Sequence, residues 1–243
     1  MRVSEGSGPA AASAPAAHRS GLPAALTVLT LVSGFVDAVS YLGLGHVFAA
    51  NMTGNVVIIG FAAAGAPGFS VLGSLTSLGA FLAGAVCAGR LSTAFAGRAR
   101  RAWVRSVFVT EAVLLAVAAA IAFDRPGGAT YALIAVLAWA MGLRNATVRK
   151  LAVPDMTTTV LTMTLTGLAS ESSLAGGTDP RAGRRLVSVA AMLGGAALGA
   201  LLVLYHGLGW PLLAGALLVT GAAACCRESG AAGDTGAGDH RSA

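Results

Sequence analysis

The sequence predicts an all-α integral membrane protein with six transmembrane helices, two broken or re-entrant segments and an inverted repeat of two halves. Three observations predict this class. The chain is 56% hydrophobic with a mean hydropathy of +0.76, and only 11% of its residues are charged, where a soluble domain has about 25%. Apolar runs long enough to cross a bilayer recur along it. The cations are also distributed unevenly about these runs, as cytoplasmic retention of Lys and Arg requires.

The two ends of the chain differ from its middle. Residues 1–21 are rich in Ala, Ser, Pro and Gly, and residues 227–243 are polar and rich in Gly. Both compositions are typical of disordered tails. We expect a transmembrane domain at 22–226, divided into halves at 22–123 and 129–226. The first apolar run is too long for the core of a signal peptide and lacks a basic stretch immediately before it.

Eight apolar segments follow in order, and six of them match the length of a spanning helix. These six are Leu22–Leu44, Gly68–Gly89, Ser106–Phe123, Ala129–Lys150, Leu186–Tyr205 and Leu208–Cys226. The other two are ambiguous. Val47–Gly65 is long enough but carries polar residues near its start, and Met156–Ala169 is short for a span.

The distribution of Lys and Arg between the two sides of the membrane discriminates among three topologies. If all eight segments cross, the 16 Lys and Arg residues divide equally between the two sides. If Val47–Gly65 alone joins the six spans, the division is 13 to 3. If both ambiguous segments enter and leave on one side, only Arg125 is external and the division is 15 to 1. The positive-inside rule favours the last topology most strongly, with both termini cytoplasmic and the second topology as the alternative.

The two halves resemble each other in sequence. At an offset of 108, Gly34 matches Gly142, Asp37 matches Asn145 and Ala38 matches Ala146. At an offset of 111, Phe81–Ala85 matches Met192–Ala196, and Met52–Thr53 matches Met163–Thr164. Each half then reads span, broken segment, span, span. An odd number of crossings makes the halves antiparallel, the plan of many secondary transporters.

Two motifs resemble those of the YoaK-like bacterial inner-membrane proteins, whose domain has no established function. Gly34–Tyr41 reads GFVDAVSY and Asn51–Asn55 reads NMTGN. The second half agrees, with MGLRNA at Met141–Ala146 and a threonine tract at Thr157–Thr159. The resemblance covers about 22–226 and implies a polytopic protein of the inner membrane, but it supplies no activity. One departure is an Arg at position 144, where many members have Gln.

Asp37 is the only acidic residue inside the first span. A carboxylate in hydrocarbon costs at least about 2.5–3.5 kcal/mol, so it needs a partner, a cavity, water or a proton. One interpretation is a proton or cation site, and the other is a structural anchor that hydrogen-bonds neighbouring helices. Arg144 lies at the matching depth of the inverted second half, next to Asn145. We therefore expect an Asp37–Arg144 pair or a shared polar pocket, unless Arg144 extends to the headgroups.

The broken segments supply the remaining candidates for substrate or ion binding. Asn51, Thr53 and Asn55 surround a glycine that lets the backbone bend, and Thr158 lies in the corresponding tract of the second half. A broken helix leaves backbone groups that must find partners, and transporters place substrates there. The alternative is that local side-chain bonds satisfy these helix ends.

Small residues occupy matched places in the two halves, and we expect them to let helices approach closely within or between protomers. They are Gly84, Ala88, Gly195 and Gly199. Glu111, in the third span, is expected to pair with Arg105 or to form part of a relay, and we favour the pairing.

The sequence carries no motif for catalysis, a metal or a cofactor, so we expect no enzyme. The expected partners are the lipid bilayer, a small solute or proton, and a second copy of the chain; nucleic acid is excluded because the net charge of +6 reflects topology. Two function classes remain, a secondary transporter with a midplane pocket around Asp37 and a membrane scaffold or sensor that transports nothing. The cost of intramembrane polar groups favours the transporter.

Overall fold

A computed structural model of the chain describes residues 22–95, 100–124, 128–151, 161–178 and 182–231. All regular elements in this described part are helices, namely eight α-helices and one short 3₁₀ helix. Their bounds are α1 Leu22–Gly43, α2 Met52–Ala63, α3 Val71–Ala94, α4 Arg100–Asp124, α5 Thr130–Leu151, α6 Leu161–Ser170, η2 Ser173–Ala175, α7 Ala182–His206 and α8 Gly209–Ala231. Both expected tails (apart from 227–231, which continue α8) and Thr158 lie outside the described residues.

Five of the described helices, α1, α3, α4, α5 and α7, are long and apolar enough to cross a membrane. In α8 the apolar stretch Gly209–Ala224 is shorter, and α2 is a short apolar helix as well. The protein is therefore a multi-pass membrane protein. Its long helices expose large apolar side chains, such as Leu72, Leu193 and Leu204, as expected of helices in contact with lipid.

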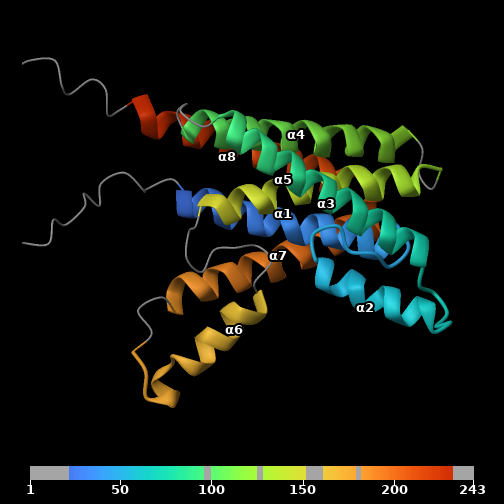
Figure 1. Ribbon diagram of the computed structural model, residues 1–243, viewed down its shortest axis with the longest axis horizontal. Coiled ribbons are helices and arrows are strands. Elements are labelled where there is room, and N and C mark those ends of the chain that lie inside the picture. The colour runs from blue at the N-terminus through green and yellow to red at the C-terminus, as the bar shows by residue number, and fades with distance from the viewer. Residues whose placement is uncertain (1–21, 96–99, 125–127, 152–160, 179–181, 232–243) are drawn as a thin grey trace, which may run out of the picture.

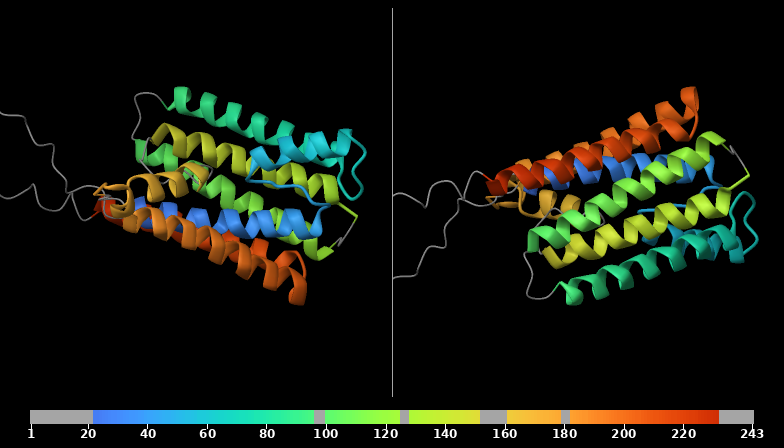
Figure 2. Two further views of the ribbon diagram at one scale, coloured as in Figure 1. Left: turned by 90° about the horizontal axis from the view of Figure 1, so that it is seen from below. Right: turned by 90° about the horizontal axis from the view of Figure 1, so that it is seen from above.

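The helices form three layers (Figures 1 and 2). In the middle layer α3 packs against α5 and α1 packs against α7. On one side α4 and α8 pack together and contact α5 and α1, respectively. On the opposite side lie the two short helices, α2 against α3 and α6 against α7. The core is apolar and runs between the first two layers, with Leu29, Phe108 and Leu137 fully buried.

Glycines at matched places in the two halves let neighbouring helices pack closely, because glycine has no side chain. A Cβ on Gly195 of α7 would lie 2.0 Å from the Leu31 carbonyl oxygen of α1, and one on Gly84 of α3 would lie 2.2 Å from that of Trp139 in α5. Gly34 of α1 and Gly142 of α5 meet backbone atoms of the same partner helices just as closely. Gly199 lies against α1, and Ala88 is fully buried.

The short helices begin in the middle of the molecule and run toward opposite ends (Figure 1). The chain leaves α1, returns to mid-depth over residues 44–51, and α2 then runs back to the end at which α3 begins. Helix α6 also begins near the middle and ends near the first turn of α7.

Candidate functional site

A tight turn at the end of α1 sends the chain back into the bundle. Gly45 has φ +90° and His46 has φ +58°, both in the left-handed region. The amides of Leu44 and His46 donate to the carbonyls of Ser40 and Tyr41, which closes the turn. Leu44 and Val47 are buried on either side of it. The returning segment is thereby fixed against α1.

Three consecutive amides of the returning segment are satisfied by side chains. The Ala50 amide donates to Asp37 Oδ1 at 2.8 Å, the Ala49 amide to Ser40 Oγ at 3.1 Å, and the Phe48 amide to Asn55 Oδ1 at 2.8 Å. Asp37 and Ser40 share one face of α1, since they lie three residues apart. In hydrocarbon each unpaired amide would cost several kcal/mol. The GFVDAVSY motif therefore supplies the partners that allow an extended segment inside the membrane domain.

Asn55 is fully buried and holds the same segment from the other side. Its Nδ2 donates to the Phe48 carbonyl at 2.6 Å and to Ser77 Oγ of α3 at 3.1 Å. Ser77 Oγ in turn donates to the Phe48 carbonyl at 2.6 Å. Asn55 thus contacts both backbone groups of Phe48, which lies in the segment between α1 and α2.

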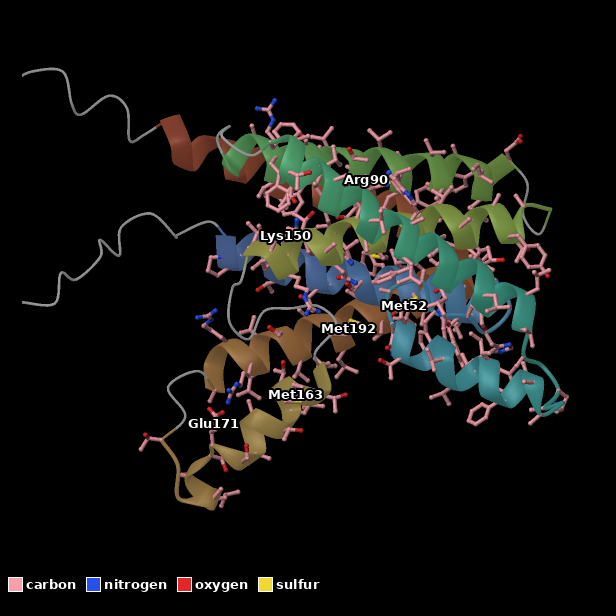
Figure 3. The ribbon with its side chains drawn as sticks, in the orientation of Figure 1. Met52, Arg90, Lys150, Met163, Glu171 and Met192 are labelled. Atoms are coloured by element: carbon pink, nitrogen blue, oxygen red, sulfur yellow. The ribbon has the colours of Figure 1, made fainter. Side chains whose placement is uncertain are left out.

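A cavity of about 540 Å³ opens beside this anchored segment. Asp37 borders it with only 5% of its surface exposed, whereas Asn51 and Thr53 are exposed to it at the start of α2. Leu161 and Thr162 at the start of α6 line the same cavity, and Met192 of α7 completes that wall. Figure 3 shows Met192 and Met52 near the middle of the molecule. The first residues of both short helices therefore meet at one cavity.

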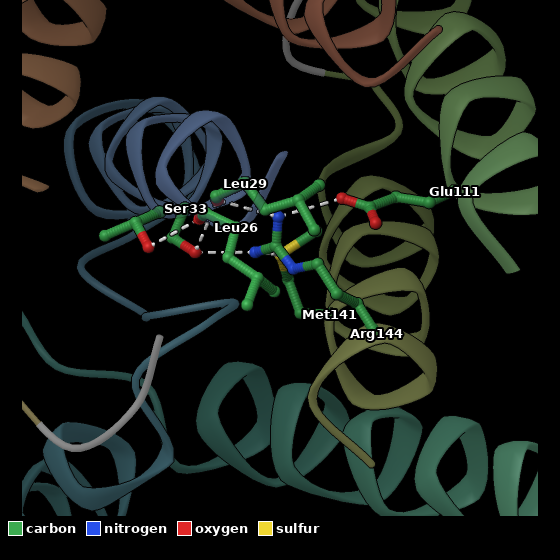
Figure 4. Close-up of polar contacts among 7 residues, drawn as sticks. Leu26, Leu29, Ser33, Glu111, Met141 and Arg144 are labelled. Carbon is green, nitrogen blue, oxygen red and sulfur yellow. Dashed lines mark hydrogen bonds and ion pairs between the residues drawn. The ribbon is translucent and has the colours of Figure 1, made fainter. Parts of the chain in front are cut away.

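Arg144 does not pair with Asp37, which corrects the expected pair. Its Nη1 donates to Glu111 Oε1 of α4 at 2.9 Å and to the Leu29 carbonyl of α1 at 2.9 Å (Figure 4). Its Nη2 donates to Ser33 Oγ of α1 at 2.6 Å, and Met141 Sδ lies 2.7 Å from it. Both members of the ion pair are fully buried. Arg144 therefore extends toward the α1–α4 side and not to the headgroups.

The expected pairing of Glu111 with Arg105 is wrong for a geometric reason. Six residues along one helix turn the two side chains to different faces, whereas pairs three or four residues apart face each other. Glu111 points into the core, and Arg105 is exposed. The partner on α5 is far away in sequence, so only the tertiary structure reveals it.

A second ion pair, absent from the sequence expectations, ties α6 to α7. Arg185 of α7 is almost fully buried and contacts Glu171 through two bonds of 3.0 and 3.2 Å. Its guanidinium lies over Gly167, where a Cβ would come within 2.8 Å of the central carbon. Figure 3 shows Glu171 at the far end of α6. The glycine is the only sequence signal for this close approach.

The remaining candidates lie elsewhere. Asn145 follows Arg144 on α5 and does not line the cavity. No group of three or more His, Cys, Asp or Glu side chains within the described residues is arranged to hold a metal ion.

The chain is similar in sequence to other proteins, both at the level of a family and to an individual relative. Residues 25–225 match the family described as "Protein of unknown function (DUF1275)". The chain is also 37% identical over 162 residues to the UPF0700 transmembrane protein YoaK of Bacillus subtilis (strain 168). The aligned region covers 65% of this chain and 69% of that relative. No solved structure gives a significant match.

Proposed function

The chain belongs to the DUF1275 family of transmembrane proteins of unknown function, and we propose that it is a secondary permease of the bacterial inner membrane. It moves a small solute or ion through the cavity beside Asp37. The observation that carries this proposal is the meeting of the first residues of two short helices, a buried carboxylate and exposed polar side chains at one cavity. Transporters use this combination because broken helices bring polar backbone and side-chain groups into the membrane.

The proposed topology has six spans, namely α1, α3, α4, α5, α7 and α8. Helices α2 and α6 return to the side from which their segments enter. Of the 16 Lys and Arg residues, 15 then lie on the cytoplasmic side together with both termini. The starts of α2 and α6 in the middle of the molecule support this arrangement.

The proposed inverted repeat is supported by matched packing. Gly34 on α1 faces the Met192 carbonyl of α7, and its counterpart Gly142 on α5 faces the Phe81 carbonyl of α3. In the same way Gly195 faces Leu31, and Gly84 faces Trp139. Related helices run in opposite directions, as Figure 2 allows the reader to follow. Such symmetry gives a transporter two similar conformations, one open to each side.

The helix packing supports a division of the molecule into two moving bodies. Helix α1 of the first half packs on α7 and α8 of the second, and α5 of the second half packs on α3 and α4 of the first. Rocking of one sequence half against the other would tear these contacts apart. The moving bodies in our proposal are α1–α7–α8 and α3–α4–α5, which keep these contacts and meet each other where α4 packs against α8, with α2 and α6 carried by α3 and α7.

Uptake by purified protein in proteoliposomes tests the proposal. We expect solute uptake that depends on an imposed proton gradient or membrane potential, and its loss in Asp37→Asn. Gly194→Ala is the matched control, because a Cβ at that position meets nothing within 4 Å. No uptake of any solute in a panel of cations, anions and neutral compounds would contradict transport and leave a scaffold or sensor as the function.

A further inference from the structure

The described residues that line the cavity beside Asp37 carry only negative charge. Among the described residues that line it, Asp37 is the only one with a charged side chain. No ion-pair partner of Asp37 occurs in the described part of the chain, because Arg144 is committed to Glu111. The Asp37 carboxylate accepts a hydrogen bond from the Ala50 amide, which orients it without neutralising it. A positively charged ligand would supply the charge that is missing among the described lining residues.

Aromatic rings cover the same cavity. Tyr41, Phe48, Phe61 and Phe69 all line it. Tyr41 stacks on Phe48 with ring centroids 4.8 Å apart, and Phe61 lies 5.8 Å from Phe69. His46 does not line the cavity, but it lies between the two pairs. Its ring is edge-on to Tyr41 and to Phe69, with ring centroids 5.2 Å and 6.3 Å apart, respectively. The rings thus form one continuous row beside the carboxylate.

This chemistry discriminates between classes of ligand. Aromatic faces attract cations and bind the apolar body of an organic molecule. Metal cations such as Ca²⁺ need six or more oxygen ligands, and Mg²⁺ needs an octahedral set. The described lining residues supply one carboxylate, the Asn51 side chain and the hydroxyls of Tyr41, Thr53 and Thr162 among mostly apolar side chains. A free anion would meet the Asp37 carboxylate, and none of the described residues that line the cavity carries a positive charge to offset it.

The size and opening of the cavity fit an organic molecule. A volume of about 540 Å³ lies within the range of about 300–1,000 Å³ for small-molecule sites. Val57 and Phe61 line the cavity and are 49% and 50% exposed. They lie on α2 in the outer layer of the molecule, so this side of the cavity is open at the surface.

We propose that the cavity binds a lipophilic organic cation, an amine or quaternary onium ion, with Asp37 as its counter-ion and the aromatic row around its apolar body. This inference rests on the proposed permease function and names its substrate class. Binding leaves Asp37 paired on two sides, with the cation and with the Ala50 amide.

Equilibrium binding of radiolabelled tetraphenylphosphonium to the full chain in nanodiscs tests the inference, with empty nanodiscs as background. We expect saturable binding that tetraethylammonium competes away. Tetraphenylborate has the same shape and the opposite charge, so in separate samples without tetraphenylphosphonium the protein should not bind it above the background of empty nanodiscs. Saturable binding of tetraphenylborate as tight as that of tetraphenylphosphonium would overturn the inference, since the site would then recognise shape alone.

Variants locate the bound cation. Asp37→Asn removes the charge but keeps a side-chain oxygen for the Ala50 amide, so the protein still folds and binding falls at least tenfold. Phe61→Leu weakens binding about two- to fivefold, the range of a cation–π contact at an exposed site. Phe123→Leu is the matched control, since Phe123 is 49% exposed and packs on Trp210 instead of lining the cavity. Equal binding by Asp37→Asn, Phe61→Leu and Phe123→Leu would overturn the site.

Parallel uptake measurements separate this inference from the proposed function. Asp37-dependent uptake of another solute by protein that does not bind tetraphenylphosphonium would overturn the substrate class and leave the permease. Specific cation binding without uptake of any cation would support the site and contradict the permease.

Discussion

Burial and pairing differ among the three polar residues Asp37, Asn55 and Arg144. Asn55 is fully buried with its amide committed to Phe48 and Ser77. Arg144 is fully buried and bound to Glu111 and α1. Asp37 alone both holds the backbone and borders the cavity. The sequence motifs that contain them therefore combine structural residues with one candidate ligand.

Removing one member of the buried ion pair should destabilise the protein strongly. Glu111→Leu leaves the Arg144 guanidinium unpaired in the core, and we expect a loss of about 3–5 kcal/mol in the free energy of unfolding. The double variant Glu111→Leu with Arg144→Met should regain most of this loss, because two apolar side chains pack where two charges were. Unfolding in detergent measures both. Additive losses in the double variant would show that the pair is not coupled.

Asn55 should matter for stability more than its exposed neighbour Asn51. Asn55→Ala leaves the Phe48 amide without its partner and the Phe48 carbonyl with Ser77 alone, and we expect a loss of about 1–3 kcal/mol. Asn51→Ala is the matched control, since the Asn51 side chain makes no capping hydrogen bond at the start of α2; there we expect a change within about 0.5 kcal/mol. Similar losses for both would argue against the anchoring role of Asn55.

At the scale of helices, apolar run length and small-residue spacing carry much of the fold. The first span was expected at Leu22–Leu44 and α1 occupies Leu22–Gly43. Ala129–Lys150 was expected for α5, which occupies Thr130–Leu151. Helix α4 begins earlier than Ser106, at Arg100, because a helix continues past the apolar run that marks it in the sequence.

What the sequence could not supply are the contacts between distant segments. The polar start of Val47–Gly65 indicated a break but not that helix begins only at Met52. Asp37, Ser40 and Asn55 replace helical hydrogen bonds there, and no periodicity reports such bonds. Glu111 and Arg144 lie on different helices, so helical spacing suggested other partners. Symmetry placed Arg144 near Asp37 but could not say which way its long side chain extends.

Adjacent glycines on α7 provide a direct test of helix packing. Gly195→Ala places a methyl group 2.0 Å from the Leu31 carbonyl oxygen, so α1 and α7 must separate. We expect a loss of about 1–3 kcal/mol, as in other overpacked sites. Gly194→Ala meets nothing within 4 Å and should leave stability unchanged or raise it by up to about 1 kcal/mol through helix propensity. Unfolding curves of the two variants give the comparison, and equal effects would contradict the close α1–α7 contact.

The whole molecule combines two interlocked bodies with a short helix on each. Arg144 on α5 holds Leu29 and Ser33 of α1, so one guanidinium joins the α3–α4–α5 body to the α1–α7–α8 body. The cavity lies where the two short helices begin, one carried by each body. A relative movement of the bodies would therefore alter the cavity and the contacts of Arg144 together. The proposed movement requires that α2 and α6 each return to the side of the membrane from which their segments enter.

Cysteine labelling from each side of the membrane tests that arrangement most directly. In a background with Cys87, Cys225 and Cys226 replaced, Ala64→Cys lies in the turn after α2 and Ser173→Cys in the turn after α6, both exposed. We predict that an impermeant thiol reagent added to intact cells labels Ala64→Cys, and that Ser173→Cys reacts only when the cytoplasmic side is opened. Labelling of Ser173→Cys in intact cells, or protection of Ala64→Cys there, would contradict the inverted arrangement.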